Sequence, residues 1–297
     1  QLNPDHIRNA IGEFADSLVV VGNPSLIKVH AHVQDPNSLL ELGASFGIVQ
    51  QVQIDNMDNQ HHEYVASHRP TSDTSEANPS KVTIISIANG LGLETIFNDL
   101  GASRVITGGN SMNPSVQDIL NSLESVEASE IILLPNNKNI IPAANQAAEI
   151  CTKAVTVLET TTIPQGISAA LAFDHEKTYT ENLSSMNNTI SSVTTCEIVQ
   201  AVRSTTINEV QIKASQTIGM IENEILAVGN EPSTVLLELL HKADLSDGDL
   251  VTLYWGHRIT QPIANRDLEN LEENFQDVEI QMIPGGQLYY DYILSIE

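Results

Sequence analysis

The chain has 297 residues, 41% of them hydrophobic, so it is long enough for about two globular domains. Its 13 basic and 38 acidic residues give a formal net charge of −25, which repels phosphate backbones and anionic lipid and argues against nucleic acid and membrane surfaces as partners. Cys151 and Cys196 lack CxxC spacing, and no signal peptide or integral membrane segment is found, which predicts a cytoplasmic protein without disulfides.

The first 58 residues predict a small α+β domain. Because the chain starts at Gln1 and enters a helical pattern at once, we expect this domain to be incomplete at its amino terminus and the chain to be a fragment of something longer. Its predicted elements are a helix at 4–15, a hairpin of strands 18–21 and 26–33, a helix at 35–46 and a strand at 48–54.

Residues 59–81 predict a flexible linker between this domain and the rest of the chain. The segment is rich in Asn, His, Ser, Thr and Asp and has few apolar residues to bury. We expect its second half, 67–79, to be the part of the chain that proteases cleave most readily.

Residues 82–192 predict a doubly wound α/β subdomain. Short aliphatic runs alternate with amphipathic helical patterns, which is typical of right-handed crossovers and a parallel sheet covered by helices on both faces. The predicted strands are 82–88, 105–106, 131–134 and 154–158, and the predicted helices are 91–100, 116–123, 140–151, 165–173 and 179–191.

Residues 193–297 predict a mixed α+β subdomain that begins with antiparallel strands and returns to alternating order. The predicted strands are 196–202, 210–212, 217–221, 224–228, 250–255, 278–283 and 289–296, and the helices are 233–242 and 263–275.

Three polar loops follow strands of the doubly wound subdomain, and we expect them to form one rim that faces a ligand or a partner. The loops after the strands that end at Ile106 and Leu134 are predicted to lie at the carboxyl ends of neighbouring parallel strands, where open α/β sheets bind ligands. The candidate residues are Thr107, Gly108, Gly109, Asn110, Ser111, Asn113, Ser115, Asn136, Asn137, Lys138, Asn139, Thr162, Gln165, Gly166 and, outside the loops, Arg203.

Each of these features also has a purely structural interpretation. Ser111 or Asn113 before Pro114 suits a helix cap as well as a ligand contact. Asn89-Gly-Leu-Gly92 resembles a phosphate-binding turn, but tight packing explains its glycines better. Arg203 favours an ion pair. The sequence has no nucleophile elbow, Walker lysine or aspartate cluster, so we identify no complete catalytic site.

His30 and His32 form the nearest pattern to a metal site. Residues two apart on a strand point to the same side and can share one ion, but a zinc site needs at least a third ligand. Spacing alone therefore favours an exposed strand face.

Several ordered motifs resemble the A-subunit family of fatty acid kinases, whose members have been called dihydroxyacetone-kinase-like. The resemblance covers nearly the whole chain but only the family's middle and carboxyl-terminal domains. The motifs are residues 16–22, 27–32, 108–115, 134–139, 163–166, 201–203 and 285–287.

The resemblance implies a fold and a division of labour. An amino-terminal kinase domain, which this chain lacks, binds ATP and magnesium, and the carboxyl-terminal domain is DegV-like. The middle domain of the family binds zinc through a His-x-His pair, matched by His30 and His32, and a cysteine whose segment is absent here. The implied partners are a DegV-like fatty-acid-binding carrier and the chain's own kinase domain, with a homodimer left open.

The resemblance therefore implies a non-catalytic part of a fatty acid kinase that docks the carrier, while the missing kinase domain phosphorylates the carrier's fatty acid for phospholipid synthesis. A rival hypothesis is a DegV-type domain whose rim binds a small molecule or a lipid through its carboxylate or phosphate. A third, an autonomous hydrolase or kinase, lacks the motifs that it needs.

Overall fold

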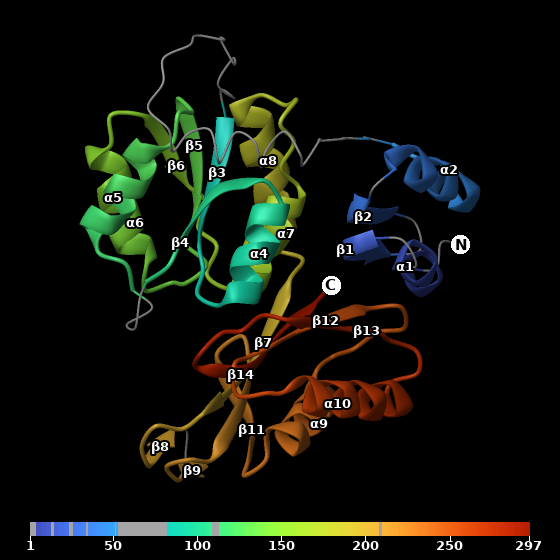
Figure 1. The fold of residues 1–297 in the computed structure, drawn as a ribbon. Coiled ribbons are helices and arrows are strands. Elements are labelled where there is room, and N and C mark those ends of the chain that lie inside the picture. Colours follow the sequence, from blue (N-terminus) through green and yellow to red (C-terminus); the bar gives the residue numbers. More distant parts are fainter. Residues whose placement is uncertain are drawn as a thin grey trace. The chain divides into compact units, whose positions relative to one another are not determined.

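The computed structural model describes residues 4–12, 15–23, 26–33, 35–50, 52, 82–108, 113–207 and 210–297. The chain divides into two compact units, residues 1–79 and 80–297, each described by itself below (Figure 1). The predicted linker, 59–81, lies outside the described residues. Among the described helices, none has the length and apolar character required to cross a bilayer.

The first unit is a hairpin with two helices. Helix α1 (Pro4–Gly12) packs against strand β1 (Ala15–Asn23), which pairs antiparallel with β2 (Leu26–Val33). Helix α2 (Pro36–Phe46) starts at the N-cap Asp35, whose carboxylate accepts from the Asn37 backbone N–H at 3.1 Å. The expected helix, hairpin and helix are all confirmed.

The strand predicted at 48–54 is wrong for every residue of it that the structure describes. Residues 48–50 and 52 have no regular structure, and Ile48 is 90% exposed. The aliphatic run 48–54 gave the pattern of a strand, but a strand needs a partner, and the described sheet of this unit holds β1 and β2 only.

The second unit begins with a four-stranded parallel sheet in the order β4-β3-β5-β6. Its strands are β3 (Val82–Ile87), β4 (Ala102–Ile106), β5 (Glu130–Leu134) and β6 (Ala154–Val157). The doubly wound prediction is confirmed, but β4 and β5 are not neighbours. The chain places β4 on one side of β3 and then crosses back to place β5 on the other, so β3 separates the two polar loops.

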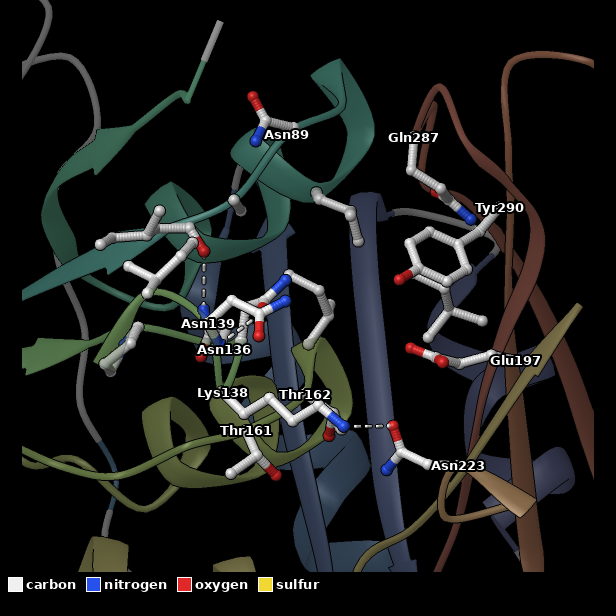
Figure 2. A pocket seen from close by; sticks show the side chains of 18 residues that line it. Asn89, Asn136, Lys138, Asn139, Thr161, Thr162, Glu197, Asn223, Gln287 and Tyr290 are labelled. Atoms are coloured by element: carbon white, nitrogen blue, oxygen red, sulfur yellow. Dashed lines mark hydrogen bonds between the residues drawn. The ribbon is translucent and has the colours of Figure 1, made fainter. Parts of the chain in front are cut away.

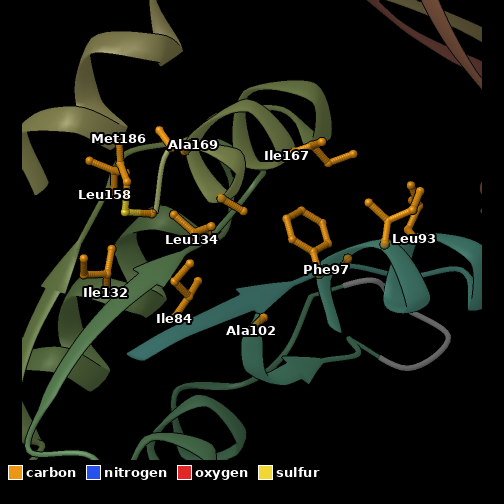
Figure 3. Close-up of a cluster of buried hydrophobic side chains, with 14 of the residues drawn as sticks. Ile84, Leu93, Phe97, Ala102, Ile132, Leu134, Leu158, Ile167, Ala169 and Met186 are labelled. Carbon is orange, nitrogen blue, oxygen red and sulfur yellow. The ribbon is translucent and has the colours of Figure 1, made fainter. Parts of the chain in front are cut away.

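Helices cover both faces of this parallel sheet (Figure 1). Alternation along the strands decides which side chain meets which layer: Ile84 faces one core and Ile85 the other. Figure 3 shows the first core, in which Phe97 packs with Ile84 and Leu134. One layer contains α4 (Leu91–Asp99), α7 (Ile163–Leu171) and α8 (Tyr179–Ile190), and the other contains α5 (Val116–Ser125) and α6 (Ile141–Ile150).

The remainder of the unit is a six-stranded mixed sheet in the order β11-β10-β7-β14-β12-β13. Helices α9 (Pro232–Lys242) and α10 (Gln261–Asn274) pack on one face of it. Its strands are β7 (Thr194–Gln200), β10 (Thr217–Ile221), β11 (Glu224–Gly229), β12 (Leu250–Trp255), β13 (Glu279–Pro284) and β14 (Tyr290–Ile296), and a separate hairpin holds β8 (Thr205–Ile207) and β9 (Val210–Ile212).

The two sheets of this unit share a core and are held together at the backbone. Tyr254 and Ile293, from the mixed sheet, belong to the same buried cluster as Phe97. The Leu93 N–H at the start of α4 donates to the Gly285 carbonyl at 3.0 Å. A Cβ added to Gly92 would lie 1.8 Å from the Pro284 carbonyl oxygen. The glycines between Asn89 and Gly92 therefore allow close packing against the β13–β14 loop.

Candidate functional site

A cavity of about 300 Å³ lies between the parallel and mixed sheets of the second unit (Figure 2). On the parallel side it is lined by the segments that follow β3 and β5. These neighbouring strands lead into α4 and α6, which cover opposite faces of the sheet, so the cavity occupies the topological switch point. This is where an open α/β sheet leaves a crevice at its carboxyl edge.

Asn136 forms the floor of the cavity and is held from four directions. Its side-chain NH₂ donates to Ser86 Oγ at 2.8 Å and to the Ile87 carbonyl at 3.0 Å. Its Oδ1 accepts from Thr160 Oγ1 at 2.8 Å, and its backbone N–H donates to the same oxygen at 3.1 Å. Gly166 makes room for this network, since a Cβ there would lie 2.0 Å from Asn136 Oδ1. Asn136 therefore has a structural role.

The opposite wall comes from the mixed sheet and carries an acid. Figure 2 shows Glu197, from β7, and Tyr290, from β14, pointing into the cavity toward Lys138 and Asn139. Lys138 Nζ donates to Asn223 Oδ1 at 3.1 Å, and this contact joins the loop after β5 to the turn between β10 and β11. The cavity thus contains amides, hydroxyls, one lysine and one glutamate.

Burial changes the acidity of both groups on the mixed-sheet wall. Loss of water raises the pKa of Glu197, the positive charge of Lys138 opposes this rise, and Glu222 adds to it. Burial and the nearby Glu197 raise the pKa of Tyr290 to about 12, so its hydroxyl keeps its proton at neutral pH. The wall therefore offers an O–H donor beside a carboxyl group that is costly to ionise.

The described part of the predicted rim divides between the cavity and its surroundings. Thr162 lines the cavity and caps α7, where its hydroxyl accepts from the Gln165 N–H at 3.4 Å. Gln165 Oε1 accepts from the Thr161 N–H at 2.8 Å and so braces this loop from outside. The predicted residues that line the cavity are Asn136, Asn137, Lys138, Asn139 and Thr162.

The loop after β4 lies apart from the cavity lining in its described residues. Ser115 is the N-cap of α5 in a capping box with Asp118, and Thr107 and Asn113 are exposed. Gly108 donates its N–H to Asn89 Oδ1 at 3.0 Å and so positions a lining residue. Gly109, Asn110 and Ser111 lie outside the described residues.

Arg203 is exposed between β7 and β8 and does not line the cavity. No ion pair involves it among the residues that the structure describes.

Sequence reasoning missed the mixed-sheet wall altogether. Glu197 follows the buried Cys196 in a strand, and alternation alone would place it toward solvent. Asn223 lies in a turn, and Gln287 and Tyr290 lie near the carboxyl terminus of the chain. Only the packing of one sheet on the other brings these residues to the cavity.

The described residues do not supply a metal centre. His30 and His32 pair through their backbones with Val19 and Ser17 of β1, which offer no imidazole, thiolate or carboxylate. The side chains of both histidines lie outside the description, and no group of three or more potential ligands occurs among the described residues. With two candidate ligands at most, zinc enters no step below.

Glu197→Gln should raise the free energy of unfolding at neutral pH. Because the pKa of Glu197 is higher in the folded protein, the native state binds its proton more tightly and loses stability as the pH rises above the unfolded value. Glutamine removes this loss, which amounts to about 1.4 kcal/mol for each pH unit between the two pKa values. Urea unfolding between pH 4 and 8 should show a gap that closes toward acid.

The control for this variant is Glu159→Gln, an exposed acid beside the cavity that does not line it. Its unfolding curve should follow the wild type at every pH. Parallel pH profiles for wild type and Glu197→Gln would contradict the raised pKa.

The arrangement of a parallel α/β lobe and a mixed lobe around a cavity is the fold of DegV family proteins. Residues of this chain superpose on a DegV family protein from Corynebacterium glutamicum with a TM-score of 0.50 and 14% identity, over 73% of this chain and 96% of that one. A DegV family protein from Ruminococcus gnavus, described with vaccenic acid, gives 0.51 and 12%, over 73% and 100%. The dihydroxyacetone kinase of C. freundii, in complex with AMP-PNP and Mg²⁺, gives 0.50 and 12%, over 84% and 57%.

The chain belongs to the FakA-like family of fatty acid kinases. The family's middle domain matches residues 1–64, and its carboxyl-terminal domain matches residues 83–297. Uncharacterized proteins of Staphylococcus aureus strains USA300 and bovine RF122 are each 34% identical over 290 residues, which is 98% of this chain and 53% of theirs. The chain thus spans about half the length of these relatives.

Proposed function

We propose that this chain is the non-catalytic middle and carboxyl-terminal part of an ATP-dependent fatty acid kinase in the cytoplasm. One observation carries the proposal: the family's middle and carboxyl-terminal domains match in order over 1–64 and 83–297, within about half the length of the relatives. In this proposal ATP and magnesium belong to a separate kinase domain. The present chain docks a DegV-like carrier whose fatty acid is phosphorylated there.

An exposed apolar strip on the mixed-sheet lobe supports docking by this part of the chain. Val202 is 98% exposed, and the adjoining β8–β9 hairpin exposes Ile207 at 42% and Val210 at 39%. A carrier that covered these side chains would remove apolar surface from water without disturbing the core.

A DegV-like fatty-acid-binding protein should be captured by the purified chain, and hydrogen exchange should show protection within residues 80–297. Val202→Asp should weaken capture about tenfold, which corresponds to about 1.4 kcal/mol. Because Val202 is 98% exposed, its replacement should leave the unfolding midpoint unchanged.

The matched control is Ile150→Asp, which alters a residue 56% exposed on α6 of the other lobe. It should bind the carrier as the wild type does. Protection confined to residues 1–54, or turnover of ATP by this chain with fatty acid and carrier, would overturn the proposal of a non-catalytic docking domain.

A second candidate function is ligand binding in the cavity, and the cavity itself favours it. Lys138 and the amides of Asn137 and Asn139 offer donors to a carboxylate or phosphate. The DegV family protein from Ruminococcus gnavus, described with vaccenic acid, shares this fold. This candidate predicts that a small molecule or a lipid head group occupies the space between the two sheets.

A further inference from the structure

Opposite charges face one another across the cavity without pairing. Lys138 reaches in from the loop after β5, and Glu197 from β7 on the other wall (Figure 2). Within the described part of the chain they form no ion pair with one another, and Lys138 Nζ instead donates to Asn223 at 3.1 Å. The cavity therefore has a positive and a negative side with space between them.

The negative side carries polar groups that no other described residue satisfies. The Glu197 carboxylate and the Tyr290 hydroxyl make no hydrogen bond to any residue that the structure describes, although Glu197 is largely buried. Native proteins pair most buried polar groups, because an unpaired one forgoes its bonds to water. Two such neighbours on one wall indicate that a ligand supplies their partner.

Charge decides which chemical group that partner carries. A ligand with only a carboxylate or phosphate would bring a negative charge toward Glu197 in a chain of net charge −25. An ammonium group instead donates to the carboxylate and to the face or oxygen of Tyr290, and it neutralises the buried charge. The anionic end of the same ligand then matches Lys138 and the Asn139 amide opposite.

We propose that the cavity binds a small zwitterion, such as an amino acid, with its ammonium group against Glu197 and Tyr290 and its anionic group against Lys138 and Asn139. This inference rests on the second candidate function, ligand binding in the cavity, and is independent of carrier docking. It replaces a lipid head group by a soluble metabolite that carries both charges.

Titration calorimetry on the 297-residue chain, with probes of similar length, tests the proposal. L-norleucine and 6-aminohexanoate carry both charges, hexanoate carries only the carboxylate, and pentylamine carries only the ammonium. At least one zwitterion should bind tenfold or more tightly than either singly charged probe. Glu197→Gln and Lys138→Met should each weaken that zwitterion at least tenfold, whereas Glu159→Gln should not.

Two results would overturn the proposal in different ways. Tightest binding of hexanoate, or of oleate, would sink the zwitterion and leave the cavity as a carboxylate site. Failure of every probe to bind would remove both the zwitterion and the second candidate function. Because Glu197→Gln is expected to stabilise the fold at neutral pH, its loss of binding could not be ascribed to unfolding.

Discussion

Gly92→Ala should destabilise the second unit by more than about 3 kcal/mol or prevent its folding. The new Cβ would lie 1.8 Å from the Pro284 carbonyl oxygen and 2.6 Å from the carbonyl carbon. Both atoms belong to the backbone of the β13–β14 loop, so no side chain can rotate away. Relief requires the loop to move, which breaks the bond from the Leu93 N–H to the Gly285 carbonyl and disturbs the wall of the cavity.

Gly248→Ala is the matched control for this variant. Gly248 has a φ of +87° and open space around its Cβ position, so alanine there adds backbone strain of about 1 to 2 kcal/mol but no collision. Guanidinium unfolding of the two variants separates these effects. If Gly92→Ala cost no more than Gly248→Ala, the close approach of the two loops would be refuted.

The periodic elements were predictable because their signals are local. Strand β2 at Leu26–Val33 and strand β12 at Leu250–Trp255 have the predicted bounds. Both are runs of aliphatic or alternating residues between turn signals. The short strand β8, Thr205–Ile207, was missed because its three residues carry no period long enough to recognise.

Strand order was not predictable, and the candidate site depends on it. Periodicity says that β3, β4 and β5 exist, but not that β3 lies between the other two. Chain order alone suggested that the loops after β4 and β5 meet. The switch point instead joins the segments after β3 and β5, which moves Asn89 into the lining and leaves Ser115 as a cap.

The roles of neighbouring asparagines also required the structure. In the run 134–139 the side chains of Asn136 and Asn137 have the same chemistry and adjacent positions. The backbone of Asn136 has a φ of 56°, which turns its side chain inward to the Ser86 hydroxyl, whereas Asn137 Oδ1 accepts from the Asn139 N–H nearer the surface at 2.8 Å. One serves the fold and the other remains available at the rim.

Asn136→Ala should therefore lower the free energy of unfolding by about 3 kcal/mol or more. The variant leaves Ser86, Thr160 and the Ile87 carbonyl without the partners that the Asn136 amide now supplies, and each unsatisfied buried group costs about 1 to 3 kcal/mol. Alanine is also less tolerant than asparagine of a φ of 56°. For a unit of this size the melting temperature should fall by roughly 6 to 12 °C in calorimetry.

Asn137→Ala provides the comparison, because it removes the same amide one residue away. It loses one exposed bond to the Asn139 N–H, so its cost should be at most about 1 kcal/mol. Equal destabilisation by the two variants would mean that the Asn136 network does not hold the floor of the cavity. A large loss for Asn136→Ala alone would show that the most buried amide of this site serves folding, which leaves recognition to the side chains that still face the cavity.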